Sequence, residues 1–439
     1  MKATRVSLSP SGRGIAERAL LPAILVAVLA GGAAAAPAEW TVLAYLSGDS
    51  SLEAAAIGYL HMLQATPAGD AVRIAVQIDR SPGYTTDEGN VVGAVRVVLA
   101  SRRGAGRREA EGTGWHCAVD MGDPKVLEEF ADWAVHACPA KRYLLLIMGH
   151  GNGVRALRLE EDEGHVPASG VAYDASSGGD CLTTSELGKA CGRIAEMAGG
   201  PLGVLAVDAC FSATAELACE VAPSVECLTG SPGLIYEPGV PWADVLGRLV
   251  QKPGMTAQEV GKLVVEVVRA EQERGGAPKG AYLAADLSRA GELEARVAKL
   301  VGVLGGRLNE VAPLITLGRS RARVSGLHSE MVDLSSFLRG LAEAAGEAGD
   351  GQVLELASSA ASAADAMLLA RFAGGDGGGA AEPGWVAFFP PSLTAFPSDY
   401  LDTGAFARRV GWGRLLSGYL GHMVELVTPA VEGARTAGT

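Results

Sequence analysis

The sequence predicts an α/β fold in which a mostly parallel β-sheet lies between layers of helices. Two continuous apolar runs, at residues 143–148 and 202–207, have the composition of strands that are covered on both faces, as in parallel sheets. The segment between them, at residues 184–196, has the pattern of a helix. Strand, helix and strand in this order indicate a βαβ unit with parallel strands.

The first 36 residues are expected to be a signal peptide and not part of the fold. Arg5, Arg13 and Arg18 precede an apolar run at residues 19–30, and small residues follow to Ala36. This order is typical of secretory signals, so we expect cleavage near Ala36 or Ala38 and a secreted or periplasmic protein. The alternative is a retained membrane anchor, although the run is shorter than the roughly 20 residues of a bilayer span.

Residues 37–250 are predicted to form the α/β core. A strand at 40–47 ends in a turn where Asp49 or Ser51 can cap a helix that runs to Leu63. Asp123-Pro124 opens a second helix, with proline in the first turn. This second helix runs to residue 137, and a further helix is predicted at 212–219. The other predicted strands are at 72–78 and 89–99.

Residues 251–439 are predicted to form a helix-rich C-terminal region that returns a strand to the core. The helical patterns cover residues 255–272, 293–311, 341–372 and 412–427. Two strands are predicted between them, at 282–287 and 385–389. We find no internal repeat.

Composition and charge exclude some partners. The formal net charge is −13, which argues against nucleic acid or an anionic membrane surface and suits a cationic substrate. The chain has seven cysteines, so one thiol would stay free if the others paired. No two cysteines form a CxxC pair, which argues against a zinc site.

Two reactive side chains follow the two most apolar strands. His150 comes after the strand at 143–148, and Cys210 comes after the strand at 202–207. Sites in open α/β sheets form beyond the carboxyl ends of the strands. If the two strands are neighbours, His150 and Cys210 lie close together at that edge.

A thiol and an imidazole at this edge indicate nucleophilic catalysis. The imidazole raises the thiolate fraction of Cys210, the thiolate attacks a carbonyl carbon, and the imidazole then protonates the leaving amine. Gly151 lets the backbone approach the substrate, so its N–H and that of Cys210 are the candidate oxyanion-hole donors. The start of the helix predicted at 212–219 would also stabilise a thiolate. Taken singly, a histidine after a strand is more often a structural or surface residue, and a cysteine after an apolar strand is usually a small buried hydrophobic residue. Together, with glycines around His150 and Asp208 near Cys210, they favour catalysis.

The two blocks resemble the caspase-like clan of cysteine peptidases and, within it, the clostripain family. Each is an apolar strand, followed by His-Gly in the first block and by Asp-Ala-Cys in the second. The resemblance extends over nearly the whole mature chain, at residues 40–52, 77–80, 282–287, 331–337 and 385–390, and at Glu216, Tyr400 and Trp412.

The resemblance implies a caspase-like fold and an endopeptidase that cleaves after Arg or Lys with a Cys–His dyad and no metal in the chemistry. It also implies that Asp208 is the floor of the pocket for the basic side chain, and a carboxylate pairs well with a guanidinium. The alternative is that Asp208 caps the following helix. Glu237 is a candidate second acidic wall. We expect polypeptide substrates with basic residues, no membrane contact after signal removal, and a monomer.

Two features of the loop between histidine and cysteine bear on maturation and calcium. Members of the family commonly mature by cutting themselves in this loop, and here it carries Arg155 and Arg158. The family's namesake uses calcium, for which residues 160–163 (EEDE) are the candidate. This run lacks the alternating ligands of an EF-hand loop, so a solvated acidic turn is favoured and no cofactor is expected to be required.

Two other functions compete with an endopeptidase. One is a non-catalytic binding or scaffold protein on the same fold, against which the presence of His150, Gly151, Asp208 and Cys210 argues. The other is a different acyl-transfer enzyme, an amidase or a transpeptidase.

Overall fold

The protein is represented by a computed structural model, and the residues described below belong to its part after Ala36. The described ranges are 37–66, 69–81, 83–86, 92–99, 110–114, 118–153, 170–275, 280–325, 328–374, 384–397, 400–401 and 404–436. The predicted signal peptide, Cys117, Arg155, Arg158 and the acidic run at 160–163 lie outside them. Within these ranges, no helix is both long enough and apolar enough to span a bilayer.

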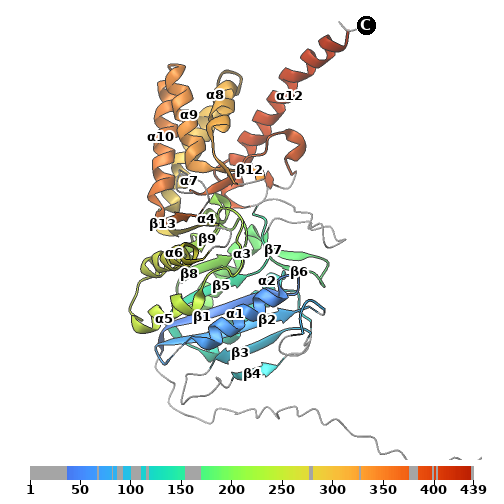
Figure 1. Ribbon diagram of the computed structural model, residues 1–439. Helices are drawn as coiled ribbons and strands as arrows, with labels where there is room; N and C mark the ends of the chain where they lie inside the picture. The colour runs from blue at the N-terminus through green and yellow to red at the C-terminus, as the bar shows by residue number, and fades with distance from the viewer. Residues whose placement is uncertain are drawn as a thin grey trace, which may run out of the picture. The chain divides into compact units, whose positions relative to one another are not determined.

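A nine-stranded sheet runs through the molecule (Figure 1). Its order is β13-β10-β9-β8-β5-β1-β2-β3-β4. The five central strands, from β9 to β2, are parallel, and antiparallel pairs extend the sheet at both edges. The strands are β1 (Ala38–Gly48), β2 (Val72–Arg80), β3 (Val95–Leu99), β4 (Ala110–Gly114), β5 (Ala140–Met148), β8 (Leu202–Asp208), β9 (Val225–Gly230), β10 (Ala281–Asp286) and β13 (Leu368–Ala373).

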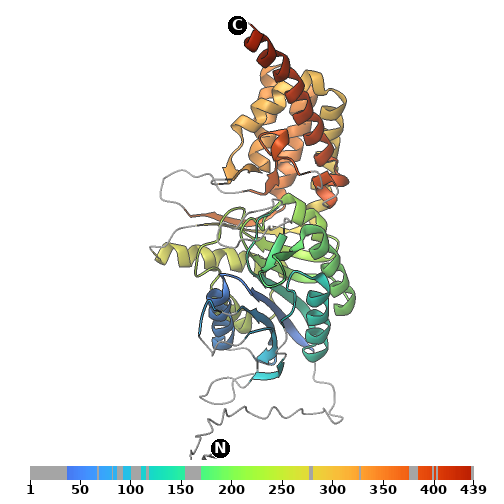
Figure 2. The same ribbon diagram turned by 90° about the vertical axis from the view of Figure 1, so that its right-hand side faces the viewer.

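Helices cover both faces of this sheet, as Figure 2 shows from the side. One hydrophobic cluster joins the sheet to α1 (Glu53–Ala65), α5 (Trp242–Gln251) and α6 (Ala257–Arg274). A second cluster joins the opposite face to α2 (Pro124–Ala137), α3 (Thr184–Ala198) and α4 (Ala215–Val221). Because apolar side chains face both ways along β1, β5 and β8, the continuous apolar runs follow from burial on two sides. The predicted α/β class with a mostly parallel sheet is confirmed.

The C-terminal half supplies further helices and a small second sheet, and a short hairpin comes from the N-terminal half. Its helices are α7 (Ala290–Gly306), α8 (Leu308–Arg321), α9 (Leu334–Glu347), α10 (Gly351–Ala366), α11 (Ala405–Arg408) and α12 (Trp412–Thr436). A three-stranded sheet has the order β11-β12-β14, with β11 (Val324–Ser325), β12 (His328–Asp333) and β14 (Val386–Phe388). A hairpin of β6 (Gly170–Asp174) and β7 (Asp180–Thr183) precedes α3.

Several predicted element bounds were wrong. The helix predicted at 293–311 is two helices that separate at Arg307, just after the poor helix formers Gly305 and Gly306. The Ala-rich segment at 341–372 is α9, α10 and then β13, with a break at Gly349, whose φ is +77°. The helix predicted at 212–219 begins only at Ala215, because the side chain of Thr214 caps it by accepting from the N–H of Leu217.

Candidate active site

The strands β5 and β8 that lead to His150 and Cys210 are direct neighbours. They pair in parallel, with Met148 opposite Asp208. The N–H of Gly149 donates to the carbonyl oxygen of Asp208 at 3.4 Å. His150 and Cys210 each lie two residues beyond this pair, so both leave the same edge of the sheet at the same level.

The chain turns sharply at Cys210 before α4 begins. Phe211 has a positive φ of 53°, a backbone conformation that residues other than glycine seldom adopt. Its N–H donates to the carbonyl oxygen of Gly233 at 2.8 Å, and the N–H of Ala213 donates to that of Ser231 at 2.9 Å. These bonds fix residues 209–214 against the segment that follows β9. We call these residues the nucleophile turn, after the role that the sequence predicts for Cys210.

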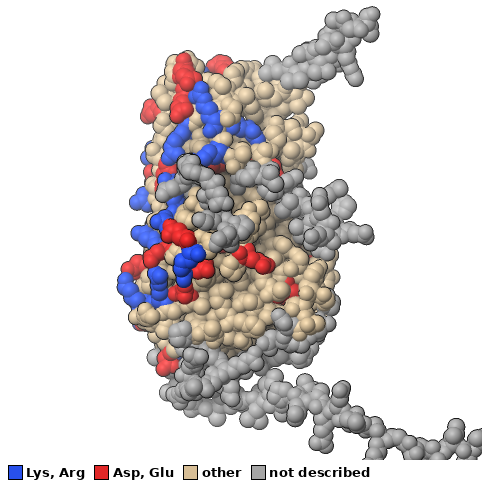
Figure 3. Space-filling view, in the orientation of Figure 1, with Lys and Arg blue, Asp and Glu red and all other residues tan. Residues whose placement is uncertain are grey.

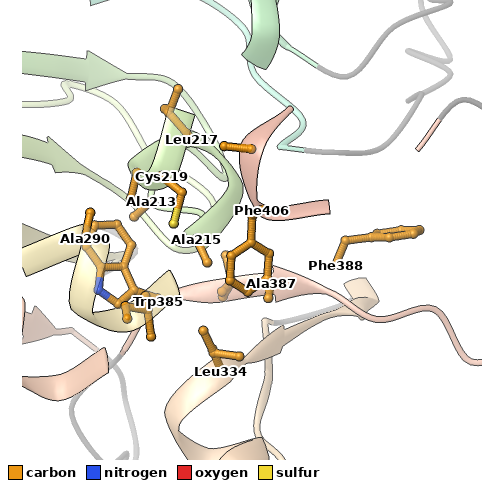
Figure 4. Close-up of a cluster of buried hydrophobic side chains, with 14 of the residues drawn as sticks. Ala213, Ala215, Leu217, Cys219, Ala290, Leu334, Trp385, Ala387, Phe388 and Phe406 are labelled. Carbon is orange, nitrogen blue, oxygen red and sulfur yellow. The ribbon is translucent and has the colours of Figure 1, made fainter. Parts of the chain in front are cut away.

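The nucleophile turn is also attached to the C-terminal half. The N–H of Val386 donates to the carbonyl oxygen of Ala213 at 3.2 Å, and Thr214 forms a parallel bridge with Val386. Figure 4 shows Trp385 and Ala387 beside Ala213 and Ala215 in a common apolar cluster. Strand β14, encoded about 170 residues later, therefore supports the turn that carries Cys210.

The thiol of Cys210 is partly buried and accepts a hydrogen bond from the backbone N–H of Ile235. Burial raises its pKa above the ordinary value, and the N–H of Ile235, 3.3 Å from Sγ, acts in the opposite direction. The expectation that a helix start stabilises the thiolate was wrong, because α4 begins five residues after Cys210 and dipole effects fade beyond the first turn. A neutral thiol of this kind needs a base to become a nucleophile.

His150 is held by a serine of the β1–α1 turn. Its Nε2 lies 2.9 Å from Oγ of Ser51. We predicted that Ser51 or Asp49 caps α1, and this was wrong: Leu52 occupies the cap position and no side chain caps the helix. The Ser51 hydroxyl instead contacts the imidazole, which fixes the orientation of the ring.

Gly151 packs directly on the nucleophile turn. A Cβ atom at Gly151 would lie 2.6 Å from the carbonyl oxygen of Cys210 and 2.8 Å from Cβ of Ala209. Gly151 is opposite Val171 in β6. On either side of this pair, the N–H of Ala172 donates to the carbonyl oxygen of His150, and the N–H of Asn152 donates to the carbonyl oxygen of Gly170. In such a pair the N–H of Gly151 points away from β6. The close approach therefore requires glycine here.

His150 and Cys210 line one cavity of about 420 Å³. Asp208 and Glu237 also line it, so four residues that the sequence singled out share one cavity. Its remaining wall is largely apolar and comes from α1, the end of β5 and the loop before α5, with Leu52, Ala54, Ala55, Gly58, Tyr59, Met62, Met148, Ile235 and Tyr236 among its members.

Asp208 lies at the buried end of this cavity and is 5% exposed. Its carboxylate accepts hydrogen bonds from the hydroxyl of Tyr59 at 3.1 Å, Nε1 of Trp242 at 2.7 Å and the hydroxyl of Tyr282 at 2.5 Å. Burial raises the pKa of Asp208 to about 6, although these three donors favour the carboxylate. The alternative in which Asp208 caps the next helix was wrong, because Thr214 is the cap of α4.

Glu237 lies at the exposed side of the cavity, in the loop before α5. This loop rests on Tyr59: a Cβ atom at Gly239 would meet the Tyr59 hydroxyl at 2.1 Å, and the N–H of Val240 donates to that hydroxyl at 3.1 Å. The hydroxyl that donates to Asp208 thus also orders the loop that carries Glu237.

The sequence did not reveal the hydrogen-bond partners of Asp208 or of His150. Tyr59, Trp242 and Tyr282 come from α1, α5 and β10, and Ser51 comes from the turn after β1. No spacing along the chain connects them, because the sheet and its helices bring them together. The only sequence signal was an unusual polar residue, Asp208, at the end of an otherwise apolar strand.

The described cysteines form no disulfide bonds. The six that the structure describes are all free thiols, and five of them are buried. Of these six, only Cys210 lines the cavity.

Comparison with known proteins gives the family. The model of the clostripain family, peptidase C11, matches residues 103–360, which is more than half of the chain. Clostripain of Hathewaya histolytica is 25% identical over 225 residues, and the match covers 48% of this chain but only 42% of that protein. The chain thus aligns with less than half of this curated relative.

Solved structures agree on the fold. A secreted C11 cysteine protease from Bacteroides thetaiotaomicron, solved with an irreversible peptide inhibitor, has a TM-score of 0.61 at 15% identity and covers 86% of this chain and 99% of its own. An inactive zymogen of a C11 protease from Parabacteroides distasonis has a TM-score of 0.57 at 13% identity, covering 87% and 97%. The resemblance seen in the sequence is therefore confirmed: this chain belongs to the clostripain family of cysteine peptidases, peptidase family C11.

Proposed function

We propose that this protein is an endopeptidase that cleaves polypeptides after Arg or Lys, with Cys210 as the nucleophile and His150 as the proton-transfer residue. The observation that carries the proposal is the single cavity lined by His150, Cys210 and the buried Asp208. The thiol, the imidazole and a carboxylate are the three groups that such a reaction needs.

In the proposed reaction, His150 accepts the proton of the Cys210 thiol and Sγ attacks the scissile carbonyl carbon. The tetrahedral intermediate collapses to a thioester, the C–N bond breaks, and His150 gives its proton to the leaving amine. Water then gives a proton to His150 and attacks the thioester. This step releases the new carboxylate, and the proton returns to the thiol. Every step uses side chains of the chain and water, so no cofactor is required.

The N–H groups of Gly151 and Cys210 are proposed to stabilise the oxyanion. Support comes from the packing of Gly151 on the nucleophile turn, which brings the two backbone segments together. Within the described part of the chain, neither N–H donates to a backbone carbonyl. Both are therefore available to a negative charge that develops on the substrate.

Asp208 is proposed to bind the basic side chain of the substrate. The apolar wall suits the methylene stem of Arg or Lys, and the carboxylate at the buried end suits its charge. Glu237 is a second acidic group on the exposed side. On the face in Figure 3, Lys and Arg lie among Asp and Glu, and a broad area carries little charge.

We also propose that the protein acts outside the cytoplasm as a monomer. Support comes from the signal-like first 36 residues and from the secreted protease of Bacteroides thetaiotaomicron. Each proposed catalytic group comes from one chain. N-terminal sequencing of the exported protein tests the cleavage near Ala36 or Ala38.

The function is tested with short fluorogenic amides that carry Arg, Lys, Leu or Glu before the scissile bond. We expect the fluorophore to be released from the Arg and Lys substrates only. We expect no release above background in Cys210→Ala or His150→Ala. Cys138→Ala is the matched control, because it removes a buried thiol outside the cavity. Equal turnover in Cys210→Ala and the wild type would refute the dyad.

The competing functions predict other results. An irreversible inhibitor with Arg next to its thiol-reactive group should label Cys210, as peptide mapping would show; a non-catalytic binding protein would not be labelled. Mass spectrometry of peptide mixtures distinguishes hydrolysis from a transpeptidase, since only the latter joins the acyl group to a second peptide amine.

A further inference from the structure

Three buried aspartates outside the cavity lie in one cluster. Carboxylate oxygens of Asp49, Asp79 and Asp174 are all within 4.8 Å of one another. Asp49 is 2% exposed, and the other two are fully buried. We call these three residues the acidic cluster. Buried charges of one sign are unfavourable unless a cation or a proton neutralises them.

The protein's own donors satisfy only part of the acidic cluster. Asp79 accepts from the N–H of Arg80, and Asp174 accepts from the N–H groups of Met121 and Ser177. Oδ1 of Asp49 and Oδ2 of Asp79 are buried and have no hydrogen-bond partner among the described residues. These two oxygens are the independent sign that a positive group belongs here, because buried polar atoms are nearly always paired.

Positive side chains close to the acidic cluster are directed to other groups. Nε of Arg80 pairs with Glu53 at 2.8 Å, and Nε of Arg96 donates to Gln77 at 2.6 Å. Within the described ranges, none of the three aspartates forms a salt bridge. Among the described residues, no ion pair therefore supplies the cluster with a positive charge.

We propose that Asp49, Asp79 and Asp174 bind a hard divalent cation of the calcium or magnesium type. Calcium and magnesium take oxygen ligands, mainly carboxylates. Soft metals prefer sulfur and imidazole, and neither group belongs to the cluster. The hydroxyl of Ser176, which hydrogen-bonds to Asp49, is a further oxygen at this position.

The cation would join two segments that border the proposed catalytic site. Asp49 precedes Ser51, whose hydroxyl contacts His150. Asp174 ends β6, which pairs with the segment at Gly151, and the N–H of Ala175 donates to the carbonyl oxygen of Asp49 at 2.8 Å. A bound cation would thus hold in place the two segments next to His150, which are the turn with Ser51 and strand β6 beside Gly151. This effect on activity rests on the proposed function; the binding itself does not.

Calorimetry on the metal-free full chain tests the site, with CaCl₂ in one arm and MgCl₂ in the other. We expect one bound cation per chain, and an affinity at least about tenfold lower in Asp79→Asn and Asp174→Asn. Asp132→Asn is the matched control, because Asp132 is exposed on α2. Absence of binding at millimolar concentrations in both arms would overturn the proposal, and the cluster would then share a proton.

A variant at residues 160–163 separates this site from the other acidic candidate. Replacing all four carboxylates by amides should leave cation binding unchanged. If that variant lost binding while Asp79→Asn kept it, the proposed site would be wrong.

Terbium luminescence locates the cation without removing a ligand. Tyr45 is linked to the cluster through Met121: the Tyr45 hydroxyl donates to the carbonyl oxygen of Met121 at 3.0 Å, and the N–H of Met121 donates to Asp174 at 3.0 Å. Emission from bound Tb³⁺ should fall in Tyr45→Phe without a change in affinity. Unchanged emission would place the ion elsewhere. Cation binding without any peptidase activity would refute the proposed function and leave the site intact.

Discussion

Gly151 lies with its Cα against the carbonyl of Cys210, closely enough that a Cβ atom would come within 2.6 Å of that oxygen. This contact joins the ends of β5 and β8 at the position where the proposed nucleophile and its oxyanion donors lie.

Gly151→Ala should displace the nucleophile turn. Because backbone and Ala209 surround the added methyl group, neither neighbour can yield cheaply. We expect kcat/KM to fall by about 10²–10³-fold, the effect of losing one oxyanion donor. Gly192→Ala, in α3, is the control, since nothing lies within 4 Å of its Cβ position. Full activity in Gly151→Ala would show that the contact relaxes at no cost.

Asp208→Asn should remove selectivity for basic residues and leave the thiol reactive. Loss of a buried charged partner costs about 2–5 kcal/mol, so kcat/KM for an Arg substrate should fall accordingly. The rate of Cys210 alkylation by iodoacetamide, which is uncharged, should change little. A parallel loss of both quantities would mean that Asp208 supports the fold of the site and does not bind substrate.

The pH dependence should report Asp208 and its donors. The pKa of this carboxyl is about 6 in the free protein, so kcat/KM for Arg substrates should fall as the pH drops below about 6, where the group becomes neutral. The Tyr282 hydroxyl favours the carboxylate, so Tyr282→Phe should move this fall to higher pH. Tyr419→Phe, which removes a hydroxyl contact with Thr316 far along the chain, should leave the profile unchanged. An unmoved profile in Tyr282→Phe would contradict the assignment.

Ser51→Ala should lower kcat more than it raises KM, because Ser51 orients His150 and is not expected to touch the substrate. We expect a loss of about 3–10-fold, the kinetic equivalent of one ordinary hydrogen bond of about 1 kcal/mol. The pH profile of kcat should also shift, and Ser51→Thr should restore it. Ser320→Ala, in α8, is the control. Equal changes in Ser51→Ala and Ser320→Ala would exclude a positioning role.

Tyr400→Phe should lower stability with little effect on KM. The Tyr400 hydroxyl donates to Oε1 of Glu216 at 2.7 Å, and the N–H of Phe388 donates to the same oxygen at 2.9 Å. Loss of one donor to a buried carboxyl costs about 1–3 kcal/mol of unfolding free energy, measurable by urea denaturation. Tyr236→Phe should be neutral, because that ring is exposed. Equal stability of both variants would show that water replaces the lost donor.

Continuous apolar runs explain which parts of the fold could be predicted. Strands β1, β2, β5 and β8 are buried on two faces, so their composition alone identified them, and the carboxyl ends of β5 and β8 indicated where His150 and Cys210 lie. Strand β13 was missed because it lies at the sheet edge and is only half-buried, so an Ala-rich helical pattern extended over it.

The partners of the site residues could not be predicted for a different reason. Tyr59 and Tyr282 reach Asp208 from positions 149 and 74 residues away along the chain. Such contacts depend on the order of strands in the sheet, and local sequence carries no record of that order. Ser51 was assigned to a helix cap by its position in the turn, although its hydroxyl contacts His150.

The support that β14 gives to the nucleophile turn has a consequence for biosynthesis. A ribosome makes the segment around Cys210 long before it makes Val386, whose N–H bonds to Ala213. Until that later strand emerges, the turn lacks one of its two anchors and Trp385 is missing from the surrounding apolar cluster. A nascent chain can therefore hold both the imidazole and the sulfur before the turn that carries the sulfur has its second anchor.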